Sequence, residues 1–214
     1  MIILCDFDDT AAEQNVAQLL LEHFADGAWP PLRQEYRRGA ITFREYQERA
    51  FQAVRQPREA LKQYVREHST LRPGFIELAR YCKGHDVFLA IVTLGLDFYV
   101  DALLEKHGLE YLPRYAAQAI FTHNGLEYRY ANASPDCPRW GNCKCSILRQ
   151  YQAQGHRVIY IGDGVSDFCP APLADMVFAR EPLLSLCRER EISHRELTNF
   201  QEVIQELEAP EAQR

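Results

Sequence analysis

The chain begins with a short apolar run that stops abruptly at acidic residues. Met1-Ile2-Ile3-Leu4-Cys5 is followed directly by Asp6-Phe7-Asp8-Asp9-Thr10. An apolar run of this length, rich in branched side chains, is typical of a buried parallel strand. In open α/β sheets, ligands and reactive groups gather at the carboxyl ends of such strands. The first ten residues therefore predict an α/β fold with a functional site that starts at Asp6.

Asp6 and Asp8 are expected to lie on the same side of the chain. Side chains alternate along an extended backbone, so Phe7 would point the other way. Two carboxylates about 4 Å apart repel by roughly 4 kcal/mol at an effective dielectric constant near 20. Such a pair favours a bound cation. The alternative interpretation is a solvated turn after the strand.

Two further apolar runs end in polar residues in the same way. Residues 87–92 stop at Thr93-Leu94-Gly95, and residues 157–161 lead into Gly162-Asp163, with Asp167 four residues later. The carboxyl ends of parallel strands meet at one edge of a sheet. We therefore expect Thr93 and Asp163 to lie beside Asp6.

The rest of the chain reads mostly as helix. Shorter strands are expected over residues 117–121 and 176–179, and Asn124-Gly125 is typical of a hairpin turn. Thr42 and Glu45 have the spacing of a capping box, and Asp97 is expected to cap a helix. Apolar periodicity predicts helices over residues 15–24, 42–54, 57–68, 75–82, 97–106, 144–154, 183–190 and 198–208.

The pattern divides the chain into two parts. Residues 13–72 contain helical signals and no strand signal, whereas the α/β pattern flanks them on both sides. With 214 residues, of which 47% are hydrophobic, the chain is long enough for one good core and a smaller appendage. We predict a Rossmann-like core formed by residues 1–12 and 73–214, with a parallel sheet flanked by helices, and a helical cap over residues 13–72.

Composition excludes several functional classes. The net charge of −6 argues against a nucleic-acid binder or a binder of anionic membranes, which would need a basic face. No stretch approaches the roughly 18 apolar residues of a membrane helix, and the first apolar run is too short for a signal peptide. A cytoplasmic location is expected by default. The sequence does not indicate an oligomeric state.

The polar residues at the predicted strand ends describe a phosphate site. Four carboxylates in a small space need a cation, and all-oxygen ligation is what Mg²⁺ prefers. A threonine hydroxyl, a lysine ammonium and glycine-flanked amides next to Mg²⁺ are typical of a phosphoryl-transfer pocket. One aspartate can attack phosphorus while another transfers protons. The residues of this predicted site are Asp6, Asp8, Thr93, Lys144, Asp163 and Asp167.

Each of the later residues also has an ordinary structural interpretation. Thr93 could be a plain strand terminus, Lys144 a solvated helix residue and Asp167 a helix N-cap. Their joint order, each at the end of an appropriate element, favours the functional interpretation.

The motifs resemble a known superfamily. Asp6-Phe7-Asp8-Asp9-Thr10, Thr93, Lys144 and residues 162–167 are similar to the four motifs of the haloacid dehalogenase superfamily. The helical insert after the first motif resembles the type-one cap of that superfamily. One departure is Asp9, where phosphatases of the superfamily more often have glycine. Because only a backbone amide is needed there, we expect a functional site.

This resemblance implies a role for each site residue. Asp6 would be the nucleophile that forms an aspartyl-phosphate, and Asp8 would be the general acid and base. Thr93, its neighbour Leu94 and Lys144 would hold the phosphoryl group. Mg²⁺ would be bound by Asp6, the Asp8 carbonyl and Asp163, with Asp167 supporting that shell from behind.

Closer similarity extends along most of the chain. Arg72-Pro73-Gly74-Phe75, the segment from Cys137 to Cys145 and residues 178–189 resemble the methionine-salvage phosphatase branch of the superfamily. That resemblance implies a small phosphorylated metabolite as substrate, 2-hydroxy-3-keto-5-methylthiopentenyl-1-phosphate. Phosphoserine phosphatases usually place a glutamate nine positions after the nucleophile, where this chain has Asn15, and Glu13 lies two residues short.

Two alternatives stay open at this point. One is a phosphatase for phosphoserine, phosphocholine or phosphoethanolamine. The other is a non-catalytic sensor of a phosphate ligand, although such a protein has no need of a nucleophile paired with a proton donor. Turnover of a generic aryl phosphate with and without Mg²⁺ separates the enzyme from the sensor.

The seven cysteines suit reduced thiols better than a disulfide framework, because most of them lie in apolar segments. Cys137, Cys143 and Cys145 place three thiols within nine residues. A structural zinc site usually has four ligands, and His156 or another cysteine would have to supply the fourth. Reduced thiols packed beneath a loop are the alternative.

Overall fold

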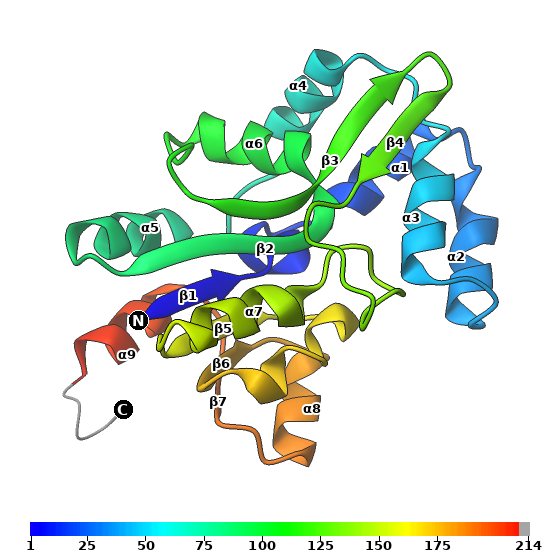
Figure 1. Cartoon of the computed structure of the whole chain (residues 1–214). Coiled ribbons are helices and arrows are strands. Elements are labelled where there is room, and N and C mark those ends of the chain that lie inside the picture. Colours follow the sequence, from blue (N-terminus) through cyan, green and yellow to red (C-terminus); the bar gives the residue numbers. More distant parts are fainter. Residues whose placement is uncertain (210–214) are drawn as a thin grey trace.

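The computed structural model describes residues 1–209 and shows a central sheet with helices on both faces (Figure 1). In this part of the chain the sheet has seven strands in the order β4-β3-β2-β1-β5-β6-β7. The strands are β1 (Ile2–Cys5), β2 (Phe88–Leu96), β3 (Arg114–Thr122), β4 (Gly125–Arg129), β5 (Val158–Gly162), β6 (Met176–Ala179) and β7 (His194–Glu196). This arrangement confirms the predicted α/β class with a largely parallel sheet.

The central strand β1 is buried on both faces. It pairs in parallel with β2 on one side, Cys5 opposite Ile91, and with β5 on the other, Cys5 opposite Ile161. All neighbours in the sheet are parallel except β3 and β4, which form an antiparallel hairpin. Because β1 and β5 end in register, the residues that follow them, Asp6 and Asp163, emerge at the same edge.

Helices cover both faces of the sheet. Ile3 and Cys5 point into the larger core with α5, α6 and α9, whereas Ile2 and Leu4 pack on the side of α7. The apolar side chains of α8 pack against β6. The α-helices are α1 (Val16–Phe24), α2 (Trp29–Arg37), α3 (Phe43–Phe51), α4 (Arg58–His68), α5 (Phe75–Gly84), α6 (Asp97–Lys106), α7 (Lys144–Ala153), α8 (Leu183–Glu189) and α9 (Gln201–Glu208), with single turns η1 (Phe7–Ala11), η2 (Val165–Asp167) and η3 (Ala171–Leu173).

The insert predicted as a cap forms helices α1 to α4. The chain enters and leaves this segment at neighbouring points, because Ala12 and Leu71 form an antiparallel bridge. Helix α4 lies along α6, where Lys62 forms an ion pair of 2.8 Å with Glu105. Helices α2 and α3 lie beside the β3-β4 hairpin, on the same side of the molecule as the carboxyl ends of the strands (Figure 1). The insert is thus placed over the edge at which Asp6 emerges.

Several local predictions differ from the structure. Strand β2 continues to Leu96, three residues beyond the predicted end at Thr93. Helix α2 was not predicted, because Pro30 and Pro31 read as a break; they occupy its first turn, where proline is tolerated. Strand β7 was also missed. Asp97 does not cap α6, since its carboxylate accepts a hydrogen bond from the Ala119 amide of β3.

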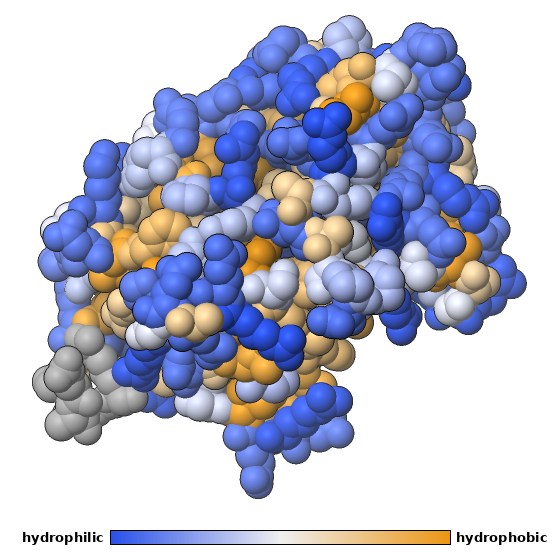
Figure 2. Space-filling model, in the orientation of Figure 1, coloured by the Kyte–Doolittle hydropathy of each residue, from blue (hydrophilic) through white to orange (hydrophobic). Residues whose placement is uncertain are grey.

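The capping box was predicted correctly. Glu45 N–H donates to the Thr42 hydroxyl at 3.2 Å, and Thr42 N–H donates to the Glu45 carboxylate at 2.7 Å. Within residues 1–209 no helix combines the length and the apolar character needed to cross a membrane. On the face drawn in Figure 2, hydrophobic areas are small and separated by hydrophilic residues.

Candidate active site

Asp6 follows β1 and forms a buried ion pair with Lys144, the first residue of α7. The Asp6 carboxylate lies 2.7 Å from Lys144 Nζ, and the two side chains belong to residues that are only 6% and 3% exposed. Burial raises the pKa of Asp6, and Asp167 and Asp163 add to the rise, whereas Lys144 opposes it. Although burial acts to lower the pKa of Lys144, Asp167 and Asp6 raise it above its usual range. Lys144 is therefore a charged residue of the site and not a solvated helix residue.

Asp163 lies at the end of β5, beside Asp6. Its carboxylate accepts a hydrogen bond of 2.8 Å from the Thr10 hydroxyl, which holds it across the gap between the two strand ends. Burial, reinforced by the nearby Asp167, raises the pKa of Asp163 to about 7. Because its charged form is disfavoured, the Asp163 carboxylate would be stabilised by any cation that enters the site.

Asp167 supports the site from beneath and is fully buried. Its Oδ2 accepts the backbone N–H groups of Asp163 and Gly164, both at 3.0 Å. Its Oδ1 accepts from Tyr160 at 2.6 Å and from Lys144 at 2.7 Å. A Cβ atom at Gly162 would lie 2.6 Å from Asp167 Oδ2, so only glycine fits at this point of β5. Asp167 thereby orients both the Asp163 backbone and the Lys144 ammonium.

Asp8 points away from this cluster, toward the start of α1. Its Oδ1 accepts from the backbone N–H groups of Val16 at 2.7 Å and Ala17 at 3.2 Å. Its Oδ2 accepts from the Tyr99 hydroxyl at 2.9 Å. Burial raises the pKa of Asp8 to about 6, even though these hydrogen bonds act to lower it. A carboxyl group with this pKa can exchange a proton near neutral pH, as general acid-base chemistry requires.

The turn between Asp6 and Thr10 is held in an unusual conformation. Asp9 has φ of 60°, a left-handed conformation that glycine adopts freely and aspartate tolerates better than most residues. Arg72 fixes this turn by donating to the Asp9 carbonyl at 2.7 Å and to the Thr10 carbonyl at 2.8 Å. The backbone geometry thus requires a residue that can adopt a left-handed conformation, which glycine does freely and aspartate tolerates.

Thr93 and Leu94 lie on the part of β2 that extends beyond β1. The Thr93 hydroxyl accepts the Gly95 N–H at 3.0 Å, and the Thr93 residue is buried. A Cβ atom at Gly95 would lie 1.6 Å from the Tyr99 hydroxyl, so glycine leaves the room that Tyr99 needs to reach Asp8. Thr93 and Leu94 line the same cavity as the carboxylates, although Thr93 is not at the end of its strand.

A cavity of about 180 Å³ lies between the strand ends and the insert. Its floor contains all the residues predicted for the site except Asp167, which lies beneath it. Its roof contains Tyr36, Phe43 and Gln47 from the insert and Trp140 from the loop before α7. The strand-end residues and the insert therefore enclose one space.

A second cavity of about 180 Å³ adjoins the first inside the insert. The two share Asn15, Ala17, Tyr36, Phe43 and Gln47 as lining residues. The second cavity is lined further by Leu21, Tyr46 and Phe51, and by Arg33 and Arg37. Gln47 is 4% exposed, and its Oε1 atom is buried without a hydrogen-bond partner. A buried acceptor left unpaired at the junction of two cavities is costly unless a ligand satisfies it.

The carboxylate cluster fits a divalent cation. One oxygen each from Asp6, Asp163 and Asp167 lie within 4.8 Å of one another. Three carboxylates and one lysine leave a net charge of about −2, which a divalent ion would neutralise. The donors are all oxygen atoms, which suits a hard cation such as Mg²⁺.

Several residues of the site carried no recognisable signal in the sequence. The Tyr99 hydroxyl donates to Asp8 and the Tyr160 hydroxyl donates to Asp167. In the sequence both tyrosines lie inside ordinary apolar segments. Gln47 and Trp140 look like surface residues of a helix and a loop until the cavities place them. Apolar side chains of the insert could contact a substrate with an apolar tail. Of these, Tyr36 and Phe43 line the cavities, whereas Leu19, Phe24 and Trp29 line neither.

The chain is similar to known proteins in both sequence and fold. It is 30% identical to a 2-hydroxy-3-keto-5-methylthiopentenyl-1-phosphate phosphatase of Lysinibacillus sphaericus, covering 96% of this chain and 94% of the relative. It is 29% identical to the protein of the same name from Brevibacillus brevis, covering 97% and 95%. A solved structure of phosphoserine phosphatase with bound substrate superposes with a TM-score of 0.72 at 19% identity, covering 96% of this chain and 97% of that one.

A family model describes the same part of the molecule as the site. The model for haloacid dehalogenase-like hydrolases matches residues 3–171, a range that includes most of β1 and all of the insert, β2, α7 and β5. This match covers the whole cluster from Asp6 to Asp167. The chain therefore belongs to the family of haloacid dehalogenase-like hydrolases.

Proposed function

We propose that the protein is a Mg²⁺-dependent phosphomonoester hydrolase that acts on a small phosphorylated metabolite through an aspartyl-phosphate on Asp6. The observation that carries this proposal is the buried cluster in which Asp6 contacts Lys144 at 2.7 Å beside Asp163 and beneath a cavity. The relatives named as phosphatases, of nearly the same length, support it. Mg²⁺ held by Asp6, Asp163 and the Asp8 carbonyl would supply charge neutralisation for the phosphoryl group.

The residues divide the reaction between two carboxyl groups. An Asp6 oxygen attacks phosphorus while the bond from phosphorus to the ester oxygen breaks, and Asp8 gives its proton to that oxygen. Water then attacks the phosphorus of the aspartyl-phosphate while Asp8 takes a proton from the water. The bond from phosphorus to the Asp6 oxygen breaks, so that the Asp6 carboxylate is restored and inorganic phosphate leaves. Lys144, Thr93 and the amide of Leu94 would hold the phosphoryl oxygens. The pKa of about 6 at Asp8 suits both of its steps.

The second cavity favours a substrate with an apolar tail. Tyr36, Phe43, Tyr46 and Phe51 give its walls aromatic surface, and the thioether end of 2-hydroxy-3-keto-5-methylthiopentenyl-1-phosphate is apolar. Arg33 and Arg37 also line it, and both would repel the ammonium group of phosphoserine, phosphocholine or phosphoethanolamine. Glu13 lines neither cavity and accepts instead from the Thr70 hydroxyl at 3.0 Å. We therefore assign the methylthiopentenyl phosphate as substrate.

The proposal includes a cytoplasmic location. All seven cysteines are free thiols, as expected for a protein kept in a reducing compartment.

A panel of phosphate esters tests this function. The full chain is assayed with the methylthiopentenyl phosphate, phosphoserine, phosphocholine, phosphoethanolamine and an aryl phosphate, in Mg²⁺ or in chelator. We expect the methylthiopentenyl phosphate to have the highest kcat/KM, by at least about tenfold over the amino-bearing esters. Chelator should reduce turnover to below about a hundredth, because the carboxylates would stay unneutralised. A leading amino-bearing ester would refute the substrate, and tight binding without turnover would indicate a sensor.

Gln47 gives a separate prediction about substrate recognition. The 2-hydroxyl of the proposed substrate is a donor that can pair with the orphaned Oε1 of Gln47. Gln47→Met keeps the size of the side chain and removes this acceptor. We expect kcat/KM for the hydroxyl-bearing substrate to fall about 10-fold to 100-fold, with less than about threefold change for an aryl phosphate that lacks the hydroxyl.

The stability of the same variant separates recognition from packing. Removing an unpaired buried acceptor should leave the free energy of unfolding unchanged or raise it, measured by chemical denaturation. Gln63→Met, on the exposed face of α4, is the matched control and should alter neither quantity. Equal losses on both substrates, together with a less stable protein, would assign Gln47 a purely structural role.

A further inference from the structure

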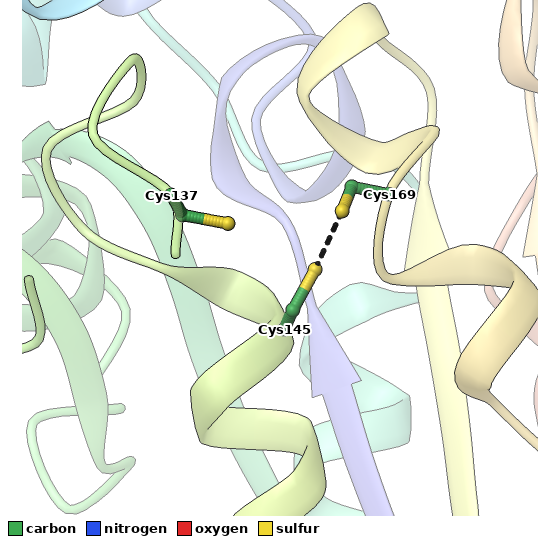
Figure 3. A group of neighbouring side chains, drawn as sticks. All are labelled: Cys137, Cys145 and Cys169. Atoms are coloured by element: carbon green, nitrogen blue, oxygen red, sulfur yellow. Dashed lines mark hydrogen bonds between the residues drawn. The ribbon is translucent and has the colours of Figure 1, made fainter. Parts of the chain in front are cut away.

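A second group of chemically reactive side chains lies behind Lys144 and is not used by the proposed reaction. It consists of four cysteines from three separate segments, which we call the thiol cluster: Cys137, Cys143, Cys145 and Cys169. Cys137 belongs to the loop between β4 and α7, Cys143 and Cys145 flank Lys144 at the start of α7, and Cys169 follows η2. Figure 3 shows the thiols of Cys137, Cys145 and Cys169 directed toward a common space.

Three of the four sulfur atoms of the thiol cluster lie close together. The Sγ atoms of Cys137, Cys145 and Cys169 all lie within 4.8 Å of one another, and those of Cys145 and Cys169 are 3.0 Å apart. Cys143 lies outside that group of three, but it borders the same space. All four cysteines line one small cavity of about 10 Å³. A space of this size accommodates a single ion or water and nothing larger.

No disulfide accounts for this arrangement. All four residues are free thiols, and 3.0 Å is well beyond the S–S bond length of about 2.05 Å. The Ser146 N–H donates to the Cys143 sulfur at 3.3 Å, and the Cys145 thiol donates to the Cys169 sulfur. The four sulfurs are therefore available as ligands around the small cavity that they line.

We propose that the thiol cluster binds one structural Zn²⁺ ion through Cys137, Cys143, Cys145 and Cys169. In a tetrahedral site with Zn–S distances near 2.3 Å, the sulfurs lie about 3.8 Å apart. The Cys145 and Cys169 sulfurs, 3.0 Å apart, are closer than this, and the Cys137 sulfur lies within 4.8 Å of both. Rotations of these side chains and of Cys143 would complete the tetrahedron. Four soft thiolates would select Zn²⁺ over the hard Mg²⁺ proposed for the carboxylate cluster.

Cys169 is the further cysteine that the sequence left open as a fourth ligand. Three cysteines between residues 137 and 145 required a fourth ligand, and His156 was one candidate. His156 instead lies near Tyr151, with ring centroids 6.3 Å apart, whereas Cys169 lies beside Cys137 and Cys145. The ion would join the loop before α7 to the loop after β5. These are the segments that carry Lys144 and Asp167, so the zinc site would hold the phosphate-binding lysine in position.

Metal content tests this proposal. The full chain is purified in the presence of reductant from cells supplied with zinc and measured by elemental mass spectrometry. We expect about one Zn²⁺ per chain in the wild type and less than about a tenth in Cys169→Ser and Cys143→Ser. Cys169 is exposed, so its replacement disturbs no core packing. Serine at position 143 retains an acceptor for the first turn of α7. Cys82 is a buried cysteine outside the thiol cluster, so the Cys82→Ala protein should contain as much zinc as the wild type.

Cobalt identifies the ligands. Metal-free protein titrated with Co²⁺ should show the strong visible bands of a tetrahedral ion and thiolate charge-transfer bands, and Cys169→Ser should lose them. A wild-type protein that is zinc-free and gives no such spectrum in reductant refutes the site. A Cys145–Cys169 disulfide in the freshly purified protein would also refute it. The Asp6→Asn protein should retain zinc. If that variant loses zinc while the cysteine variants retain it, the ion belongs to the carboxylate cluster and the proposal is overturned.

Discussion

Replacement of Asp6 by asparagine is expected to lower kcat by more than about a hundredfold and to leave the fold intact. The amide has the shape of the carboxylate but cannot attack phosphorus. Lys144 keeps its contact of 2.7 Å with Asp167, so the substitution leaves no buried ammonium without a partner. It also removes one of three mutually repelling carboxylates. The metal-free variant should therefore be at least as resistant to thermal unfolding as the wild type.

Steady-state turnover and a thermal melt measure these two effects together. Asp86→Asn is a matched control, because Asp86 is exposed, precedes β2 at the opposite edge of the sheet and has a backbone conformation that asparagine adopts equally well. It should retain full activity. An Asp6→Asn protein that keeps more than about a hundredth of wild-type turnover would assign the nucleophile to another residue.

Replacement of Asp8 by asparagine should slow both chemical steps and trap the phosphorylated enzyme. The asparagine carbonyl can still accept from Val16 and Ala17, and its amino group can donate to the Tyr99 hydroxyl, so the local structure should persist. The proton donor and acceptor is lost, which costs about 10² to 10⁴ in rate. An aryl phosphate has a leaving group that needs no protonation, so the first step should proceed and the second should stall.

Mass spectrometry of acid-quenched Asp8→Asn should then show one added phosphoryl group on the peptide that contains Asp6. Loss of that adduct in the double variant with Asp6→Asn is the control for its position. Turnover above about a tenth of wild type, with no adduct at any time, would show that Asp8 does not transfer the protons. A stable adduct on a different peptide would contradict the role of Asp6 instead.

The sequence by itself determined the class of the fold and the position of the main acidic residues. The apolar runs that end at Asp6 and Asp163 indicate buried parallel strands, and this signal depends on neighbouring residues only. The carboxyl ends of such strands must meet at one edge of the sheet. The capping box at Thr42 and the helix that begins at Lys144 depend on neighbouring residues only. Features set by local composition could therefore be predicted correctly, and the family motifs reinforced them.

Interactions between distant residues required the tertiary structure. Tyr99 meets Asp8 across 91 positions and Cys145 meets Cys169 across 24, and no periodicity connects such pairs. Asp97 was predicted from its neighbours to cap a helix, and this prediction was wrong. Its carboxylate instead accepts a hydrogen bond from the Ala119 N–H of β3, a residue distant in the sequence. The predicted end of β2 at Thr93 was wrong because pairing with β3 extends that strand beyond β1. Gln47 acquired significance only when packing of the insert left its amide oxygen buried and unpaired, because the cost of an unpaired polar atom arises from the surroundings that exclude water.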